Sequence, residues 1–177
     1  MTTTLSSKAL NQLSVAVADN TTHDEIRKIL DGTNVSHRPV ITVTDSTKTL
    51  TAAQSGSLVV LDLAAGIVVT LPEANSDNVG WYCDFVVKTT FTGTMSIDAS
   101  RAADLYYGHL NMQRGDGNQG TPVFPDQSDD DKIVASADTK GRSAGGYFRI
   151  EIAAANMLVA SGLLHVADSS SPATPFV

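Results

Sequence analysis

The stretch LVVLDLAAGIVVTLP, residues 58–72, decides the fold class. Apolar residues recur at every second position on either side of its central AAG, which is the period of a β-strand with one buried face. The side chains expected to point inward are Val59, Leu61, Leu63, Ile67, Val69 and Leu71. Gly66 can adopt the left-handed conformation that a three-residue hairpin loop requires. The stretch therefore predicts a β-hairpin that ends at Pro72.

The same period continues on both sides of this stretch. Residues 41–44 and 47–50 alternate before it, and Trp81, Cys83, Phe85 and Val87 alternate with other side chains after it. Cys83 falls on the apolar face, where a cysteine acts as a small buried hydrophobe and not as a nucleophile. Further strands are expected at 95–99, 104–110, 132–137, 147–153, 157–161 and 163–167. Phe148, Ile150 and Ile152 are expected to point inward, and Tyr147, Arg149 and Glu151 outward.

These patterns divide the chain into three parts. Nine or ten short strands separated by turns predict an all-β domain over residues 38–168, a β-sandwich that is jelly-roll-like. Residues 1–37 are expected to form an N-terminal arm with short helices, and residues 169–177 a Ser- and Pro-rich tail on the surface. The connection 111–131 has three glycines and two prolines, so it is expected to be a long loop.

The N-terminal arm carries two helical patterns. The first spans residues 7–18, and the second spans 23–31, where Thr22 and Glu25 form a capping box. Nine residues are too few for a helix that is stable alone in water, so the second helix must dock, either on its own domain or on a partner subunit. The predicted partner-binding residues are the apolar side chains of the two patterns: Leu10, Leu13, Val17, Ile26, Ile29 and Leu30.

Composition and charge restrict the function. A net charge of −7, with 12 scattered basic residues, argues against nucleic acid as a partner. The chain is 42% hydrophobic and 18% charged, which excludes a fully disordered protein. Its one cysteine allows no intrachain disulfide. Since neither a secretion signal nor a run of roughly 20 apolar residues is found, we expect a protein made in the cytoplasm without secretion and with no membrane partner.

No motif for catalysis or cofactor binding is found. The four histidines, His23, His37, His109 and His165, lie far apart on different expected elements. A hydrolase would need paired carboxylates that face one cleft. Asp84 with Glu151 is the candidate pair, but both are expected outward, where ordinary solvated charges also lie. We expect no enzyme, no cofactor and no bound metal.

The long connection contains two further patterns. Arg114-Gly115-Asp116 spells the tripeptide that integrins recognise, yet three letters arise easily by chance, so an ordinary turn is expected. Asp126 and the run 129–131 could bind calcium through hard oxygen ligands. The spacing of an EF-hand is missing, and we expect a solvated acidic loop.

Several segments together are similar to a module common in tailed bacteriophages. TKTLTAAQSG (47–56) is followed by VVLD (59–62) and IVVTLP (67–72). In the module, a TLTAADSG stretch leads to a VLD…G…VTLP hairpin and then to an FxFVV strand, a position that residues 81–87 match. Residues 150–162 and the closing TPF also resemble the end of such proteins. The resemblance covers residues 40–176 as a pattern but not the arm or the connection 111–131.

The resemblance implies a small β-rich virion protein of the head decoration, cement or capsid knob type; a cyanophage is one suggested source. The expected partners are the major capsid protein and further copies in a homotrimer, on the outer surface of the head. The alternative is an adhesin-like or glycan-binding tail or knob module that contacts a host surface glycan. Its candidate sugar contacts are Tyr82, Tyr106, Tyr107 and Trp81, although Trp81 fits the core better.

Overall fold

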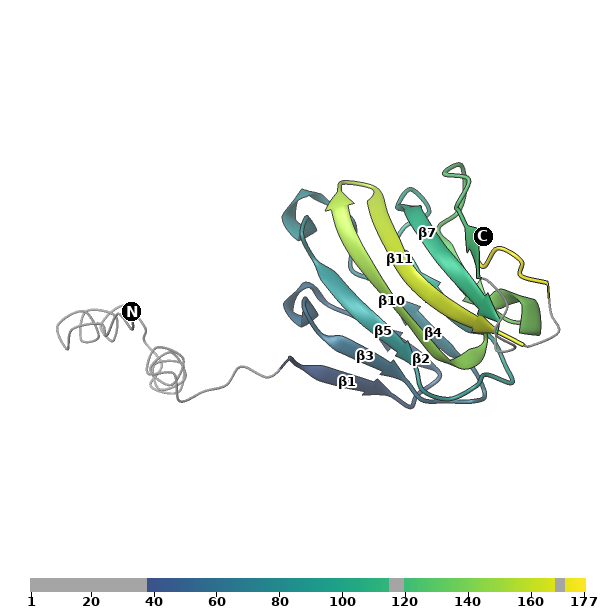
Figure 1. The fold of residues 1–177 in the computed structure, drawn as a ribbon. Helices are drawn as coiled ribbons and strands as arrows, with labels where there is room; N and C mark the ends of the chain where they lie inside the picture. Colours follow the sequence, from purple (N-terminus) through teal and green to yellow (C-terminus); the bar gives the residue numbers. More distant parts are fainter. Residues whose placement is uncertain (1–37, 115–119, 168–170) are drawn as a thin grey trace, which may run out of the picture. The chain divides into compact units, whose positions relative to one another are not determined.

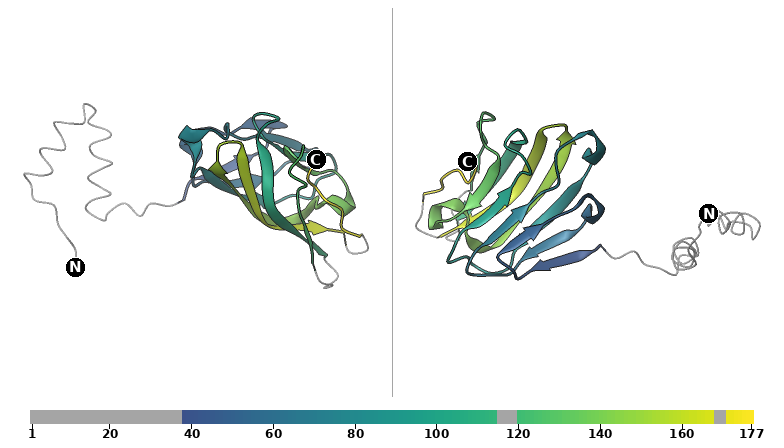
Figure 2. Two further views of the ribbon diagram at one scale, coloured as in Figure 1. Left: turned by 90° about the horizontal axis from the view of Figure 1, so that it is seen from above. Right: turned by 180° about the vertical axis from the view of Figure 1, so that it is seen from behind.

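The computed structural model describes residues 38–114, 120–167 and 171–177. The chain divides into two units, Met1–Arg38 and Pro39–Val177, and the fold is that of the second unit. It is all-β, as predicted, with two sheets that enclose one core (Figures 1 and 2). Sheet A has seven strands in the order β1-β3-β5-β10-β11-β7-β8, and sheet B has four in the order β2-β4-β6-β9.

The first six strands alternate between the two sheets. Their bounds are β1 Val40–Val43, β2 Thr47–Thr49, β3 Leu58–Leu61, β4 Ile67–Thr70, β5 Tyr82–Val87 and β6 Met95–Asp98. β1, β3 and β5 pair in parallel in sheet A, while β2, β4 and β6 pair in parallel in sheet B. The chain thus winds as three stacked coils, each giving one strand to each sheet. A jelly roll is instead built from antiparallel strands.

The predicted hairpin at 58–72 is therefore wrong. β3 and β4 lie in different sheets, and the AAG link carries the chain from one sheet to the other. The backbone of this link forms hydrogen bonds with the corresponding link of the next coil. Ala64 O accepts from the N–H of Thr92 at 2.7 Å, and the N–H of Ile67 donates to Thr94 O at 3.0 Å. Gly66 has φ +115°, and a Cβ there would lie 2.5 Å from Thr94 O. Glycine is required because the links of successive coils stack closely.

The second half of the chain completes both sheets. Its strands are β7 Leu105–Arg114, β8 Thr121–Val123, β9 Lys132–Ala135, β10 Ser143–Ala154 and β11 Met157–Val166. β10 pairs antiparallel with both β5 and β11, and β11 pairs in parallel with β7. The two strands expected at 157–161 and 163–167 form the single strand β11, which passes through Gly162 at φ +139°. Short 3-10 helices lie at Ala52–Gln54, Ser76–Asn78 and Asp138–Lys140.

The connection 111–131 is less of a loop than expected. β7 continues to Arg114, and β8 returns along it with Leu110 opposite Val123 and Met112 opposite Thr121. Pro122 lies in β8, the edge strand of sheet A. Proline is tolerated there because its lack of a backbone N–H removes no hydrogen bond between strands. The alternation of Leu110 and Met112, both buried, was the sequence signal for this extension.

The C-terminal tail is also not simply a surface segment. Phe176 is 2% exposed and forms an antiparallel bridge with Ile133 of β9. The N–H of Lys132 donates to Val177 O at 2.9 Å, and that of Val134 donates to Pro175 O at 2.7 Å. The end of the chain therefore covers the edge of sheet B, where its aromatic ring enters the core.

The core includes the side chains that the alternation assigned to it, together with others such as Phe91 and Phe176. All of the inward residues predicted in β3, β4, β5 and β10 are buried, and Leu63, after β3, is partly buried. Trp81 and Cys83 are buried too, with exposed fractions of 3% and 0%. Within the described residues, no helix has the length and hydropathy needed to cross a bilayer.

Candidate functional site

The predicted partner-binding residues lie outside the part of the chain that the structure describes. Those residues are Leu10, Leu13, Val17, Ile26, Ile29 and Leu30. The same holds for His23 and His37, and for Gly115 and Asp116 of the RGD tripeptide. The two described histidines occupy different registers on neighbouring strands, His109 opposite Ser161 and His165 opposite Gln113.

Asp84 and Glu151 both point to the outer face of sheet A, but Asp84 is not solvated as expected. It lies opposite Arg149 in the ladder between β5 and β10, and its side chain is 2% exposed. Arg149 donates from Nε to Oδ1 at 2.7 Å and from Nη2 to Oδ2 at 3.0 Å. Because both carboxylate oxygens accept from one guanidinium, Asp84 is held in an ion pair and is not open to a substrate.

Tyr82 completes this cluster. The Arg149 guanidinium carbon lies 4.6 Å from the centroid of the Tyr82 ring. Its hydrogen bonds to Asp84, opposed in part by desolvation, raise the pKa of Arg149 above its ordinary value. The cluster therefore keeps a charged group stable in the middle of a sheet face, with its charge neutralised locally.

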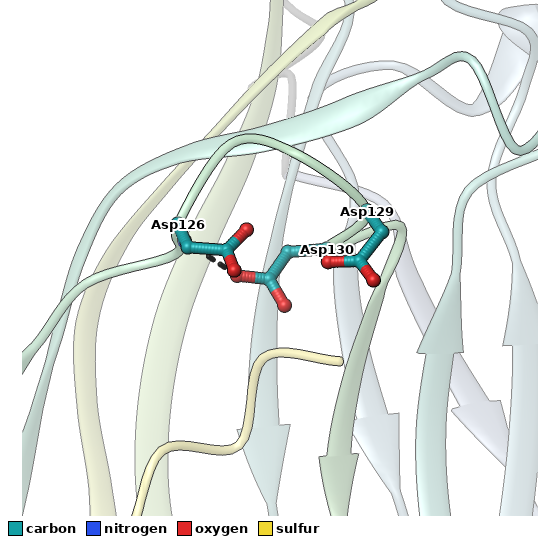
Figure 3. A group of neighbouring side chains, drawn as sticks. All are labelled: Asp126, Asp129 and Asp130. Carbon is teal, nitrogen blue, oxygen red and sulfur yellow. Dashed lines mark hydrogen bonds between the residues drawn. The ribbon is translucent and has the colours of Figure 1, made fainter.

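The aspartates of the connection between β8 and β9 do come together, as Figure 3 shows for Asp126, Asp129 and Asp130. Each of the three offers a carboxylate oxygen, and these oxygens lie within 4.8 Å of one another. This segment, residues 126–130, is called the aspartate loop below. Of the described residues, it is the one group of acidic or histidine side chains arranged so that it could hold a metal ion.

Hydrogen bonds within the aspartate loop account for its shape without a metal. The N–H of Asp126 donates to Asp130 Oδ2 at 2.6 Å, and the Ser128 N–H and hydroxyl both donate to Asp126 Oδ1. The bonds from Ser128 lower the pKa of the Asp126 carboxyl. Asp126 and Asp129 are exposed, as expected for a solvated acidic loop, whereas Asp130 is 8% exposed.

The candidate sugar-binding aromatics do not gather on one exposed patch. Tyr106 is fully buried and donates from its hydroxyl to Ile97 O at 3.2 Å, and burial raises its pKa. Trp81 is also core. Tyr82 and Tyr107 are part-buried on the outer face of sheet A.

Sequence reasoning missed a row of apolar side chains that runs across sheet A. Val60 of β3 lies opposite Val86 of β5, which lies opposite Tyr147 of β10, which lies opposite Leu163 of β11. We call these four residues the apolar row. Val60, Val86 and Tyr147 lie between buried neighbours and Leu163 precedes the buried Leu164, so all four point away from the core. The signal in the sequence was the run of adjacent apolar residues in LVVL and FVV, which leaves apolar side chains on both faces of a strand.

The structure thus defines the class of protein: an all-β unit of two sheets, with stacked parallel coils and an apolar row on its outer face. Comparisons with protein-family models, with curated proteins and with solved structures found no match.

Proposed function

We propose that this chain is a structural protein of a tailed-bacteriophage virion that binds the outer surface of the head and stabilises it. The proposed partner is the major capsid protein, and the copies assemble as a homotrimer. The chain is made in the host cytoplasm and functions in the virion without nucleic acid or membrane contacts. It performs no catalysis.

One observation carries the proposal. The segments that resemble the phage module, 47–56, 58–72 and 81–87, are adjacent in space: they supply β2, β3, β4 and β5 of the coil stack. The likeness therefore falls on one packed structural unit and is not spread over unconnected loops. The chain has a net charge of −7, so it should not bind DNA. This property suits a protein on the outside of a virus particle.

Decoration needs binding and not chemistry. A protein that binds only the mature lattice stabilises it by about 2.7 kcal/mol per site when its concentration is a hundredfold above Kd. Many copies, each contacting several capsid subunits, multiply the effect through avidity. The predicted docking residues Ile26 and Ile29 would supply an apolar contact with the lattice.

The test uses purified full-length protein and expanded, undecorated heads. The proposal predicts that the protein sediments with the heads and raises the temperature at which they disrupt. Ile29→Asp should weaken this binding, whereas Asn34→Asp, which adds the same charge to the arm without removing an apolar side chain, should leave it intact. Heads that neither bind the protein nor gain heat resistance would contradict the proposal.

The alternative function, a tail or knob module that binds host glycan, is favoured by one observation. Tyr147 is 46% exposed and shares the outer face of sheet A with Tyr82 and Tyr107. Binding of the purified chain to host polysaccharide, with immunolabel found at the tail, would support this alternative and contradict the head assignment.

A further inference from the structure

The two ends of the coil stack differ in how their strands are paired. At the end formed by β5 and β6, both strands gain a further antiparallel neighbour, because β10 pairs with β5 and β9 pairs with β6. At the other end, β1 and β2 are the first strands of their sheets, and no described strand pairs with their free edges (Figure 1). We call this the open end. A free edge presents backbone N–H and C=O groups to which a strand of another chain can add.

The core reaches the open end through sheet A. Ile41 and Val43 of β1 are in register with Val59 and Leu61 of β3, so they lie on the inner face of the sheet. Val43 is 3% exposed, and Ile41 is partly buried against the core. A second copy placed against β1 would therefore meet an apolar layer as well as free backbone groups. Apolar edge strands of this kind promote pairing between chains unless another feature opposes it.

Sheet B carries a lysine at the open end. Lys48 of β2 is in register with Val69 of β4, and the same row continues through Ile97 of β6 and Ile133 of β9. Directly paired residues point to the same face of a sheet, and the other three members of this row are 0% exposed. The Lys48 side chain therefore points to the inner face. The residues on either side of it in β2 are exposed, whereas Lys48 is part-buried.

Lys48 has no carboxylate partner among the described residues, since none of their ion pairs or hydrogen bonds includes its side chain. At an open end this is tolerable, because a lysine can lay its methylene stem along apolar side chains and keep its ammonium group in water. A strand added to β2 would enclose the ammonium without a partner, and burial of an unpaired charge is costly. Two joined open ends would enclose two such groups.

The edges at the other side of each sheet are closed by different features. The C-terminal tail covers β9 through hydrogen bonds from the N–H groups of Lys132 and Val134. In sheet A, β8 has only three residues, and its central Pro122 offers no N–H to an added strand. Each of these edges is closed to strand addition by a specific part of the sequence, and Lys48 is the corresponding feature at the open end.

We infer that Lys48 prevents two copies of the chain from joining end to end through the open ends of their coil stacks. Such a junction would pair β1 and β2 of one copy with those of another and would merge the two cores. The charge of Lys48 opposes this pairing, while the stem of the side chain still covers the end of the core. The proposed function brings many copies together on one particle, but the effect of Lys48 is a property of the free chain and does not depend on that function.

The test is sedimentation of the full-length chain and three variants over a range of concentrations. Lys48→Met removes the charge and keeps a long, unbranched side chain, whereas Lys48→Arg keeps the charge. Thr49→Met places the same apolar side chain at the exposed position next to it. Lys48→Met makes an acidic chain more acidic, so a gain in association cannot come from weaker repulsion between copies.

Lys48→Met should form a species of twice the mass of the unmodified protein, with association at least about tenfold tighter than that of the unmodified protein. Hydrogen exchange of this species should show new protection of backbone amides in β1 and β2. Lys48→Arg and Thr49→Met should sediment as the unmodified protein does. Circular dichroism establishes that each variant is folded. If Lys48→Met does not fold, Lys48→Val takes its place, with the same doubling expected.

A folded, uncharged variant at position 48 that sediments as the unmodified protein would overturn the inference. Doubling of Lys48→Arg or Thr49→Met would also overturn it, because neither the loss of the charge nor the inner position would then be required. A doubled species without new protection in β1 and β2 would place the contact elsewhere, with the same consequence. None of these measurements involves heads, so failure of the head assignment and failure of this inference remain distinguishable.

Discussion

Phe176 near the end of the chain allows a sharp test of the fold. A terminal Ser- and Pro-rich segment would ordinarily tolerate substitution, but this side chain is 2% exposed, and its ring centroid lies 6.0 Å from that of Tyr106. An aromatic side chain buries about 150–250 Å². At about 25 cal/mol per Å², the transfer free energy is roughly 4–6 kcal/mol, an upper bound because the unfolded chain already buries some surface.

Phe176→Ala should therefore lower the free energy of unfolding by about 3–5 kcal/mol, the range found for buried phenylalanines. If the tail of the variant detaches from β9, no cavity is left in the core, and the edge of β9 becomes exposed instead. Detachment occurs only if it costs less than the cavity, so the loss of free energy does not exceed this range. Urea unfolding, followed by tryptophan fluorescence of the buried Trp81, measures the change through the midpoint at constant slope.

The neighbouring residue provides the control. Val177 is 43% exposed, so Val177→Ala should change the free energy of unfolding by no more than about 0.5 kcal/mol. If Phe176→Ala cost less than about 1 kcal/mol, or no more than Val177→Ala, the tail would not be part of the core and the bridge to Ile133 would be refuted.

Further predictions concern close backbone approach, ion pairs, acid and metal. Gly108 and Gly80 both have φ +87°, but a Cβ at Gly108 would lie 2.2 Å from Ala160 O, whereas nothing lies within 4 Å at Gly80. Gly80→Ala should cost about 1–2 kcal/mol in thermal unfolding, and Gly108→Ala distinctly more; equal costs would contradict the close pairing of β7 with β11. Asp84→Asn, which leaves Arg149 without its anionic partner, should cost about 1–3 kcal/mol in urea unfolding; a neutral result would contradict the role of this ion pair. Hydrogen bonds from Lys88 and Thr89 lower the pKa of Asp62 below 3.8, so its contribution is present above that pH and lost as the pH falls through the folded-state value. The difference between Asp62→Asn and the unmodified chain should accordingly shrink over that acidic range, and a constant difference would refute the linkage. Calcium should leave the melting temperature unchanged, whereas a site in the aspartate loop would add about 2.7 kcal/mol at a hundredfold excess over Kd.

The strands and their buried faces were predictable because alternation is a local property. The inward direction of Val59 and Leu61, or of Phe148 and Ile150, can be inferred from the alternation within a few residues. The pairing of strands was not predictable in the same way. A hairpin and a link between two sheets share the same alternation and the same Gly66, and they differ only in distant partners such as Thr94.

The same reason explains what was missed on the surface. Val60, Val86, Tyr147 and Leu163 are separated widely along the chain, and only the register of four strands brings them into one row. Phe176 was missed because a single aromatic residue among prolines and serines has no period to reveal its burial. The aspartate loop was visible because its residues are close in sequence.

Electron cryomicroscopy of the parent particle is the most direct test of a structural role on the outer surface of a phage head. If the chain decorates the head, the two-sheet unit should appear as density outside the capsid lattice, in repeated copies that contact the major capsid protein. Density for this unit at the tail alone, or particles that lack the chain altogether, would contradict it.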